Sequence, residues 1–323
     1  MKEEHVKRAL GAGILLTPEI LDGLDDQKLE QMILESKQKK TVLADKEPAS
    51  KSKLLIKVKR AVPKQQMRTE DFTKYYNNKY DGIKAILLKK MDAVSINKVR
   101  DTYDEISLIG MVRESTQNGF ILEDQTGEIE VLCQDPVDVD DVIGVRGSSR
   151  EGKILAKEIV WPDISLSNQL KKMSNISLFL TTKVTSKSQP MIQSSSFVLI
   201  PELGDADLNE KEASRVMTKF TNPTTITISS MDNEMNILVY APEEDVGQER
   251  AKEFLKKRHL SPGRNKITCP DDHFLIDTVP DILWLVSSKR FLENYKGVTI
   301  ISCKAPDAAI ANLGTREIEF KQI

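Results

Sequence analysis

Residues 105–160 read EISLIGMVR (105–113), GFILED (119–124), EIEVLC (128–133), DVIGVRG (141–147) and KILAKEIV (153–160), with short polar links between the runs. Each run is short and rich in apolar or β-branched residues. Turn residues such as Asn118-Gly119, Thr126-Gly127 and Glu151-Gly152 separate the runs. Five strands in about sixty residues, with glycine at the sharp bends, are typical of an OB-type barrel. The sequence therefore predicts a five-stranded OB-fold domain over residues 101–163.

This predicted barrel is acidic. Residues 101–163 contain 15 acidic and 5 basic residues, a net charge of −10, and Phe120 is the aromatic residue in its predicted strands. Autonomous binding of single-stranded DNA needs a cationic groove and stacking rings. We therefore interpret the barrel as a protein-contact module, and keep a stand-alone single-strand-binding OB protein as an alternative.

The part of the chain before the barrel is basic, with 22 basic against 14 acidic residues over 1–100, a net of +8. Thr17 and Pro18 are typical of a helix start, so residues 1–35 are predicted to be a small helical N-terminal domain. Residues 36–53 are polar and Lys-rich, as in a flexible basic tether. A strand-helix lead-in to the OB domain follows over 54–100. Its helix, at about 69–90, is expected to bury a stripe of apolar and aromatic residues at helical spacing: Phe72, Tyr76, Tyr80, Ile83 and Leu87.

After the barrel, apolar runs of the buried-sheet kind alternate with two helical segments, Asp207–Phe220 and Glu244–Lys257. This pattern predicts an α/β layered domain over 164–323. The fold class is thus multidomain α+β: a small helical domain, a five-stranded barrel, and layered β-sheets with flanking helices.

Composition excludes several classes of protein. The apolar runs are far too short to cross a bilayer, and the first ten residues, MKEEHVKRAL, do not resemble a secretory signal. Cys133, Cys269 and Cys303 are odd in number, widely spaced and without a CxxC, which argues against a disulfide framework or a cysteine zinc site. We expect a reduced, cytoplasmic protein without a membrane partner.

The order of these parts and several phrases resemble the small, non-polymerising subunit of the archaeal family-D DNA polymerases. The phrases cover residues 54–163 and 256–302 best: VPKQQMRTEDFTKYYNNKYDGIKAIL (62–87), SINKV (95–99), SLIGMV (107–112), FILEDQTGEIEVL (120–132), KKRHLSP (256–262), FLIDTVPDI (274–282) and NYKGVTIIS (294–302).

The resemblance implies that residues 164–323 form a calcineurin-like phosphoesterase domain, which in that family performs 3′→5′ exonucleolytic proofreading with two metal ions. The family's metal ligands come from DxH, GNHD and GHxH motifs. By the flanking strands, this chain has Thr182 and Val184 in place of the first Asp and His. Asn233 stands for the catalytic His, and Ser287 and Lys289 stand for the last two histidines.

A count of histidines agrees with this substitution pattern. The chain has His5, His259 and His273, none placed to form a ligand pair with another imidazole, and the Asp271-Asp272 turn beside His273 is interpreted as solvated. We therefore predict a degenerate, inactive phosphoesterase domain without catalytic residues, metal or cofactor. The alternative is a residual exonuclease that uses Asp205, Asp232, Asn233 and Glu234, although Gly204-Asp205 is interpreted as loop.

Taken with the resemblance, these features predict an accessory scaffold subunit that binds the large catalytic subunit of a two-subunit replicative polymerase and is not an enzyme by itself. This subunit would contact DNA indirectly, through the nucleoid-associated holoenzyme. A sliding clamp and a primase are further candidate partners. Basic residues around the tether are candidates for weak phosphate contacts: Lys57, Lys59, Arg60, Lys64 and Arg68.

Overall fold

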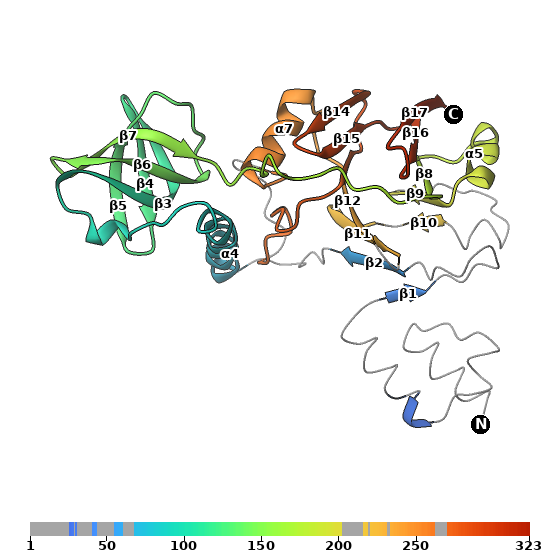
Figure 1. The fold of residues 1–323 in the computed structure, drawn as a ribbon, viewed down its shortest axis with the longest axis horizontal. Helices are drawn as coiled ribbons and strands as arrows, with labels where there is room; N and C mark the ends of the chain where they lie inside the picture. The colour runs from blue at the N-terminus through green and yellow to red at the C-terminus, as the bar shows by residue number, and fades with distance from the viewer. Residues whose placement is uncertain are drawn as a thin grey trace.

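A closed barrel and a two-sheet sandwich make up most of the chain in the computed structural model (Figure 1). None of the described helices is long and apolar enough to cross a membrane. The structure describes residues 26–28, 30, 41–43, 55–60, 68–201, 216–218, 220–230, 233–261 and 270–323.

The barrel contains the five predicted strands, in the order β3-β4-β5-β7-β6, closed by pairing of β6 with β3. Alternate side chains such as Leu108, Phe120 and Val131 fill its interior. Gly119 is required where β4 starts, because a Cβ there would lie 1.9 Å from the carbonyl oxygen of Val131. The strands are β3 (Thr102–Thr116), β4 (Gly119–Asp124), β5 (Gly127–Leu132), β6 (Val142–Arg150) and β7 (Lys153–Val160), with a 3-10 turn η1 (Ile96–Lys98) before them.

Helix α4 (Thr69–Leu87) packs against the barrel through Ile83 and Leu87, and the Tyr80 hydroxyl donates to the Ile109 carbonyl at 3.2 Å. The predicted buried stripe is only partly right. Phe72 is 41% exposed and Tyr76 is half-buried, whereas Tyr75 and Lys79 are buried. The first half of the helix therefore turns a different side inward, towards polar groups described below.

Two sheets form the sandwich, with an apolar core between them that includes Leu180, Ile237 and Trp284. The seven-stranded sheet has the order β1-β2-β11-β12-β13-β15-β14 and the five-stranded sheet the order β10-β9-β8-β16-β17. The bounds are β1 (Thr41–Leu43), β2 (Leu55–Arg60), β8 (Ser177–Leu180), β9 (Phe197–Ile200), β10 (Val216–Thr218), β11 (Thr224–Ser229), β12 (Glu234–Tyr240), β13 (Ile282–Leu285), β14 (Phe291–Tyr295), β15 (Val298–Ser302), β16 (Asp307–Asn312) and β17 (Ile318–Gln322).

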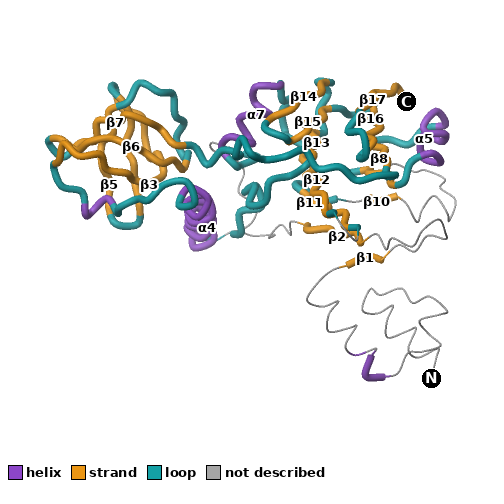
Figure 2. Tube along the Cα trace, in the orientation of Figure 1, coloured by secondary structure: helices purple, strands orange, loops and turns teal. Residues whose placement is uncertain are grey.

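Helices cover the outer faces of both sheets (Figure 2). Phe254 and Leu255 of α7 (Gln248–Lys257) pack on the seven-stranded sheet. Ile192 of α5 (Gln189–Ser194), which follows the 3-10 turn η2 (Ser186–Ser188), packs on the five-stranded sheet. The described part of the sandwich region therefore consists mainly of strands, with few helices.

The structure differs from the sequence predictions in four places. β2 is not a strand of the barrel region but pairs with β11 of the sandwich, and β1 lies inside the predicted tether. Residues 216–218, at the end of a predicted helix, form β10, while most of that segment lies outside the described residues. The apolar run HFLIDTV (273–279), whose pattern predicts a strand, makes an isolated bridge instead, between His259 and Leu275.

For two other predictions, the structure describes too few of the residues concerned to test them. Residues 26–28 and 30 are helical, while the rest of the predicted N-terminal helical domain lies outside the described part of the chain. The borders of the five predicted domains stay predictions.

Candidate functional site

Most of the positions predicted to replace catalytic ligands lie at one border of the sandwich, where the loops after β8, β12, β13 and β15 meet. The parallel strands β12, β13 and β15 end together, at Tyr240, Leu285 and Ser302. The loop after β8 joins them because the Ala305 N–H donates to Thr182 Oγ1 at 2.8 Å. We call this border the carboxyl edge, defined by Thr182, Lys183, Asp245, Ser287, Ser288, Lys289 and Lys304.

The first two substituted positions make structural contacts. Thr182 Oγ1 is occupied as the acceptor for Ala305, so this hydroxyl ties two loops together. Val184 packs into the apolar cluster between the five-stranded sheet and α5, beside Phe179 and Ile192. A valine side chain in such a cluster offers no metal ligand.

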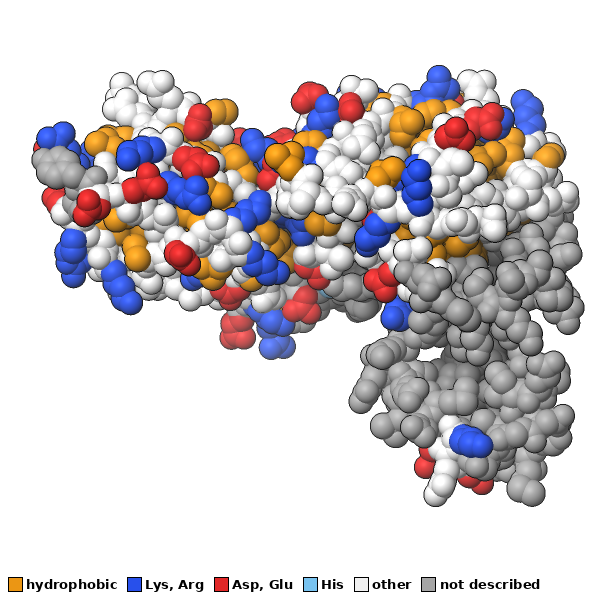
Figure 3. Space-filling model, in the orientation of Figure 1, with side chains coloured by type: hydrophobic (Ala, Val, Ile, Leu, Met, Phe, Trp, Pro, Cys, Tyr) orange, Lys and Arg blue, Asp and Glu red, His pale blue; other side chains and the backbone are white. Residues whose placement is uncertain are grey.

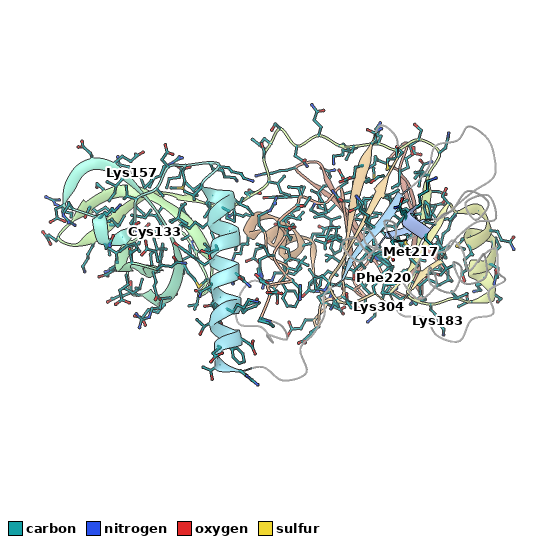
Figure 4. The ribbon with its side chains drawn as sticks, turned by 90° about the horizontal axis from the view of Figure 1, so that it is seen from below. Cys133, Lys157, Lys183, Met217, Phe220 and Lys304 are labelled. Atoms are coloured by element: carbon teal, nitrogen blue, oxygen red, sulfur yellow. The ribbon has the colours of Figure 1, made fainter. Side chains whose placement is uncertain are left out.

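Ser287 and Lys289 lie on the loop after β13. The Ser287 hydroxyl is buried and donates to Asp245 Oδ1 at 3.1 Å. The Lys289 carbonyl accepts a bond from the Ser302 hydroxyl at 2.6 Å, while its side chain is exposed. Figure 4 places Lys183 and Lys304 on the sandwich, so exposed ammonium groups lie on the loops that meet at this edge.

Asn233, the residue that stands for the catalytic His, does not lie at the carboxyl edge. β11 and β12 are antiparallel, with Ser229 paired with Glu234, so the turn that carries Asn233 lies at the amino end of β12. The carboxyl edge begins beyond Tyr240, at the other end of that strand. Asn233 and Glu234 are therefore separated from Ser287 and Lys289 by the length of strand β12.

Asp245 occupies the carboxyl edge instead, and the sequence analysis missed it. It lies in the loop after β12, and its carboxylate accepts bonds from the Ser287 hydroxyl, the Ser288 hydroxyl and the Ser288 N–H, the last at 3.0 Å. The Ser288 hydroxyl and N–H, followed by the Ser287 hydroxyl, lower the pKa of Asp245. The usable signal was the group of three acids, Glu243, Glu244 and Asp245, after the apolar run MNILVYAP, because carboxyl ends of parallel strands meet at one edge.

The donors at this edge do not fit a pair of divalent cations. Two-metal sites need several carboxylates or imidazoles that converge within ligand distance. Here the Asp245 carboxylate is bonded to two serines, and Asp307 pairs with Arg290 at 3.0 Å. Among the described residues, no three His, Cys, Asp or Glu side chains are grouped to hold a metal ion. Asp205 and Asp232 of the alternative site lie outside those residues.

A second group of charges lies where α4, the barrel and α7 meet, and most of its side chains are buried. Lys257, 8% exposed, contacts Asp141 at 2.8 Å, Asp138 at 2.6 Å and Glu253 at 2.8 Å. Burial alone would lower the pKa of Lys257, but the charge of Asp141 and the bonds to Asp138 and Asp141 raise it. The α7 end is thus joined to the loop between β5 and β6.

The neighbouring His259 and Asp272 extend this group. Both side chains are 1% exposed, and His259 Nε2 lies 3.1 Å from Asp272 Oδ2. The Ser261 N–H donates to His259 Nδ1 at 3.1 Å, so Nε2 carries the proton and donates to Asp272. Burial lowers the pKa of His259. Asp271 is exposed and pairs with Lys74, but the Asp272 side chain is buried, so the predicted solvated turn is half wrong.

Lys79 of α4 completes the group. It is 3% exposed, and burial lowers its pKa against the opposing charges of Asp140, Asp272 and Asp141. We call this set the junction, defined by Lys79, Asp138, Asp141, Lys257, His259 and Asp272.

The candidate DNA-contact residues that the structure describes do not lie together on one surface. Lys57 is half-buried on β2, an internal strand of the seven-stranded sheet. Arg68 precedes α4 and is exposed, and its N–H donates to Asp71 at 2.8 Å. Lys64 and the side chains of Lys59 and Arg60 lie outside what the structure describes. Phosphate binding by this set stays a prediction.

Comparison with known proteins confirms the resemblance to an archaeal polymerase subunit. A DNA polymerase II small subunit of Methanothermobacter thermautotrophicus is 30% identical over 112 residues, which cover 29% of this chain and 23% of that protein. A DNA polymerase II small subunit of Archaeoglobus fulgidus is 29% identical over 128 residues, 36% of this chain and 26% of that protein. The aligned segments thus span about a quarter of the length of these relatives. No family model matches the chain.

Proposed function

We propose that this chain is an accessory subunit of a two-subunit replicative DNA polymerase, in which it binds the large catalytic subunit. The observation that carries the proposal is the similarity to two archaeal proteins named DNA polymerase II small subunit. We assign the closed barrel to the OB type and the sandwich to the calcineurin-like phosphoesterases, in agreement with that similarity.

We further propose that the phosphoesterase site has lost its exonuclease activity. The carboxyl edge supports this, because Thr182 and Ser287 are used in hydrogen bonds between loops and Val184 is packed in an apolar cluster. The competing residual exonuclease would use Asn233 and Glu234, which lie at the opposite end of the sheet. No imidazole of the described residues lies near Asp245, so the edge lacks the histidine that most often serves as general acid for a leaving alkoxide.

The contacts of the barrel argue against the second alternative, a free-standing single-strand binder. Phe120 is 1% exposed, so its ring cannot stack on a base. Basic side chains of the barrel are paired with acids, as in Lys153–Glu130 and Arg146–Glu158, both at 2.8 Å. Figure 3 shows the two signs interspersed on the visible face, which is not a continuous cationic track.

The test is co-expression of this chain with the large polymerase subunit from the same source, followed by size-exclusion chromatography and primer extension. We expect the two chains to co-elute and extension to improve over the large subunit alone. Separate elution at micromolar concentration would contradict the proposal.

The nuclease part is tested separately with a 3′-mismatched primer, the purified chain, and Mn²⁺ or Mg²⁺. We expect no digestion above that of a matched protein carrying Asp245→Ala and Asp232→Ala. Metal-dependent digestion that these substitutions abolish would restore the exonuclease alternative without affecting the subunit assignment.

The proposed DNA interface has its own test in the holoenzyme. Replacement of Lys57, Lys59, Arg60, Lys64 and Arg68 by alanine should flatten the dependence of DNA affinity on salt, by roughly one unit of logarithmic slope for each lysine or arginine that neutralises a phosphate. An unchanged slope would remove these residues from the DNA interface.

A further inference from the structure

The five-stranded sheet has a free edge at β17. β17 pairs with β16 on one side, and no described strand pairs with it on the other. Figures 1 and 2 show β17 and β14 at the same border of the sandwich. An edge strand presents unpaired N–H and C=O groups on which another strand can form.

The direction of these free groups is fixed by the pairing with β16. The Asn312 N–H donates to the Glu317 carbonyl, and the Ile323 N–H donates to the Pro306 carbonyl, each at 2.9 Å. In antiparallel pairs the backbone groups of alternate residues point to the same neighbour. The odd-numbered residues of this segment therefore face β16. The N–H and C=O groups of Ile318, Phe320 and Gln322 face outward, with no partner among the described residues.

Only one register of β17 against a second copy gives both Glu319 and Lys321 a partner of opposite charge. Two copies related by a two-fold axis pair residues with outward groups with each other, so the axis can pass any residue of β17. An axis at Glu319 or Lys321 would set that charged residue against its own copy. An axis at Ile318 would set Glu317 against Glu319, and an axis at Gln322 would leave Lys321 against Ile323. An axis at Phe320 sets Glu319 of each copy against Lys321 of the other, in the close, non-hydrogen-bonded positions.

The charged pair is accessible for this contact. The Glu319 and Lys321 side chains are 65% and 35% exposed, and in the single chain they contact each other along the strand. Since both lie on the same face of the sheet, the second copy would extend the pair to a group of four alternating charges.

Apolar surface lies at the same border. Ile318 and Phe320 are half-buried against the core between the sheets, and Arg290 lies 5.7 Å from the centre of the Phe320 ring. Leu292 of β14 pairs with Ile301, which points into that core, yet Leu292 is 44% exposed. An added strand carrying another phenylalanine at the axis would cover part of this surface.

We infer that β17 pairs across its free edge with β17 of a second copy of this chain, antiparallel and centred on Phe320. The five-stranded sheets of the two copies would then form one continuous sheet. The partner is specified by opposite charges in the strand itself, so an acidic or basic strand of another protein would fit only half of the pattern.

Sedimentation velocity on the full chain, without the large subunit, tests the pairing. We expect a dimer that dissociates on dilution. Glu319→Lys and Lys321→Glu should each raise its dissociation constant by roughly tenfold or more, because each sets like charges together twice. The double variant restores opposite charges and should restore the dimer. Glu114→Lys, the same charge change on an exposed barrel strand, serves as the control.

Cysteine cross-linking tests the register. Two Phe320 positions would be about 5.5 Å apart between Cα atoms, within disulfide range, whereas two Gln322 positions would be far outside it. Mild oxidation should therefore link Phe320→Cys and leave Gln322→Cys unlinked, with the wild type as the control for native cysteines. A monomer at all concentrations, no rescue by the double swap, or linkage of Gln322→Cys instead would overturn the inference.

Discussion

The junction and the carboxyl edge both contain polar and charged groups, but they use them differently. At the junction, Lys257, Asp141, His259 and Asp272 are each less than one-tenth exposed and bond to residues far away in the sequence. At the carboxyl edge, lysine side chains are exposed and the Asp245 carboxylate is held by two serine hydroxyls.

This difference shows where the chain requires exact polar geometry. Buried charges are tolerated only when their partners are correctly placed, since an unpaired one destabilises the fold. The junction therefore depends on precise placement of the barrel on the sandwich. Among the described residues, the carboxyl edge contains no comparable buried ion pair.

The largest expected effect is at Lys257. Lys257→Met leaves Asp141 buried and unpaired, so we expect a loss of about 3–5 kcal/mol in the free energy of unfolding, measured by urea denaturation. Lys256→Met, which removes a neighbouring half-buried charge over the Trp161 ring, should cost less than about 1 kcal/mol. Adding Asp141→Leu to Lys257→Met should recover most of the loss. Equal losses in the free energy of unfolding for Lys257→Met and Lys256→Met would contradict this prediction.

His259→Phe should rank second, at about 2 kcal/mol, because it removes the donor to the buried Asp272. It should also change the pH dependence. Burial lowers the pKa of His259, so below about 6.5 the unfolded chain binds a proton that the folded chain does not. Wild-type stability should therefore fall as the pH drops from 7 through this range, and the variant should lose that slope. His273→Phe is the matched control and should keep it.

An attempt to rebuild the site should cost stability without creating a nuclease. Val184→His places an imidazole in the apolar cluster under α5, so we expect a loss of about 1–3 kcal/mol. Thermal denaturation and digestion of a labelled primer with Mn²⁺ check the two halves of this prediction. Metal-dependent cleavage by this variant would show that the edge is closer to a working site than its geometry implies.

The smallest effect is expected at Asp245. Asp245→Asn keeps an oxygen for Ser287 and should leave stimulation of the large subunit unchanged, with only a slight decrease in melting temperature near neutral pH. Because the serine bonds lower the pKa of Asp245, its ionised form stabilises the fold above about pH 4, and this contribution disappears as the solution becomes more acidic. A loss of polymerase stimulation would instead make the carboxyl edge part of the subunit contact.

The contrast also explains what the sequence could predict. The barrel strands were predictable because alternation and glycine turns are local signals, and η1 to β7 follow one another along the chain. The position of β2 in the sandwich was not predictable, because its partner β11 lies far along the sequence. The residue pattern of a strand does not indicate which other strand it pairs with. The position of Asn233 away from the carboxyl edge could not be predicted for a related reason: the pattern of β11 does not give its direction in the sheet.

The buried side of α4 shows the same limit at the level of a single helix. Spacing alone favoured Phe72 and Tyr76, but the junction brings Asp272 to the helix, so Tyr75 and Lys79 turn inward. Charge burial of this kind depends on groups from other segments, which no local pattern contains.

The position of β2 has a consequence for chain cleavage. The chain contributes β2 to the sandwich, leaves to form α4 and the barrel, and returns to the sandwich at β8. The barrel is thus joined to the sandwich by two covalent connections, one on each side. A single protease cut between β2 and α4 would leave the barrel attached through residues 161–176. β2 would stay bound by its ladder to β11, and the two fragments should migrate together until denaturant separates them.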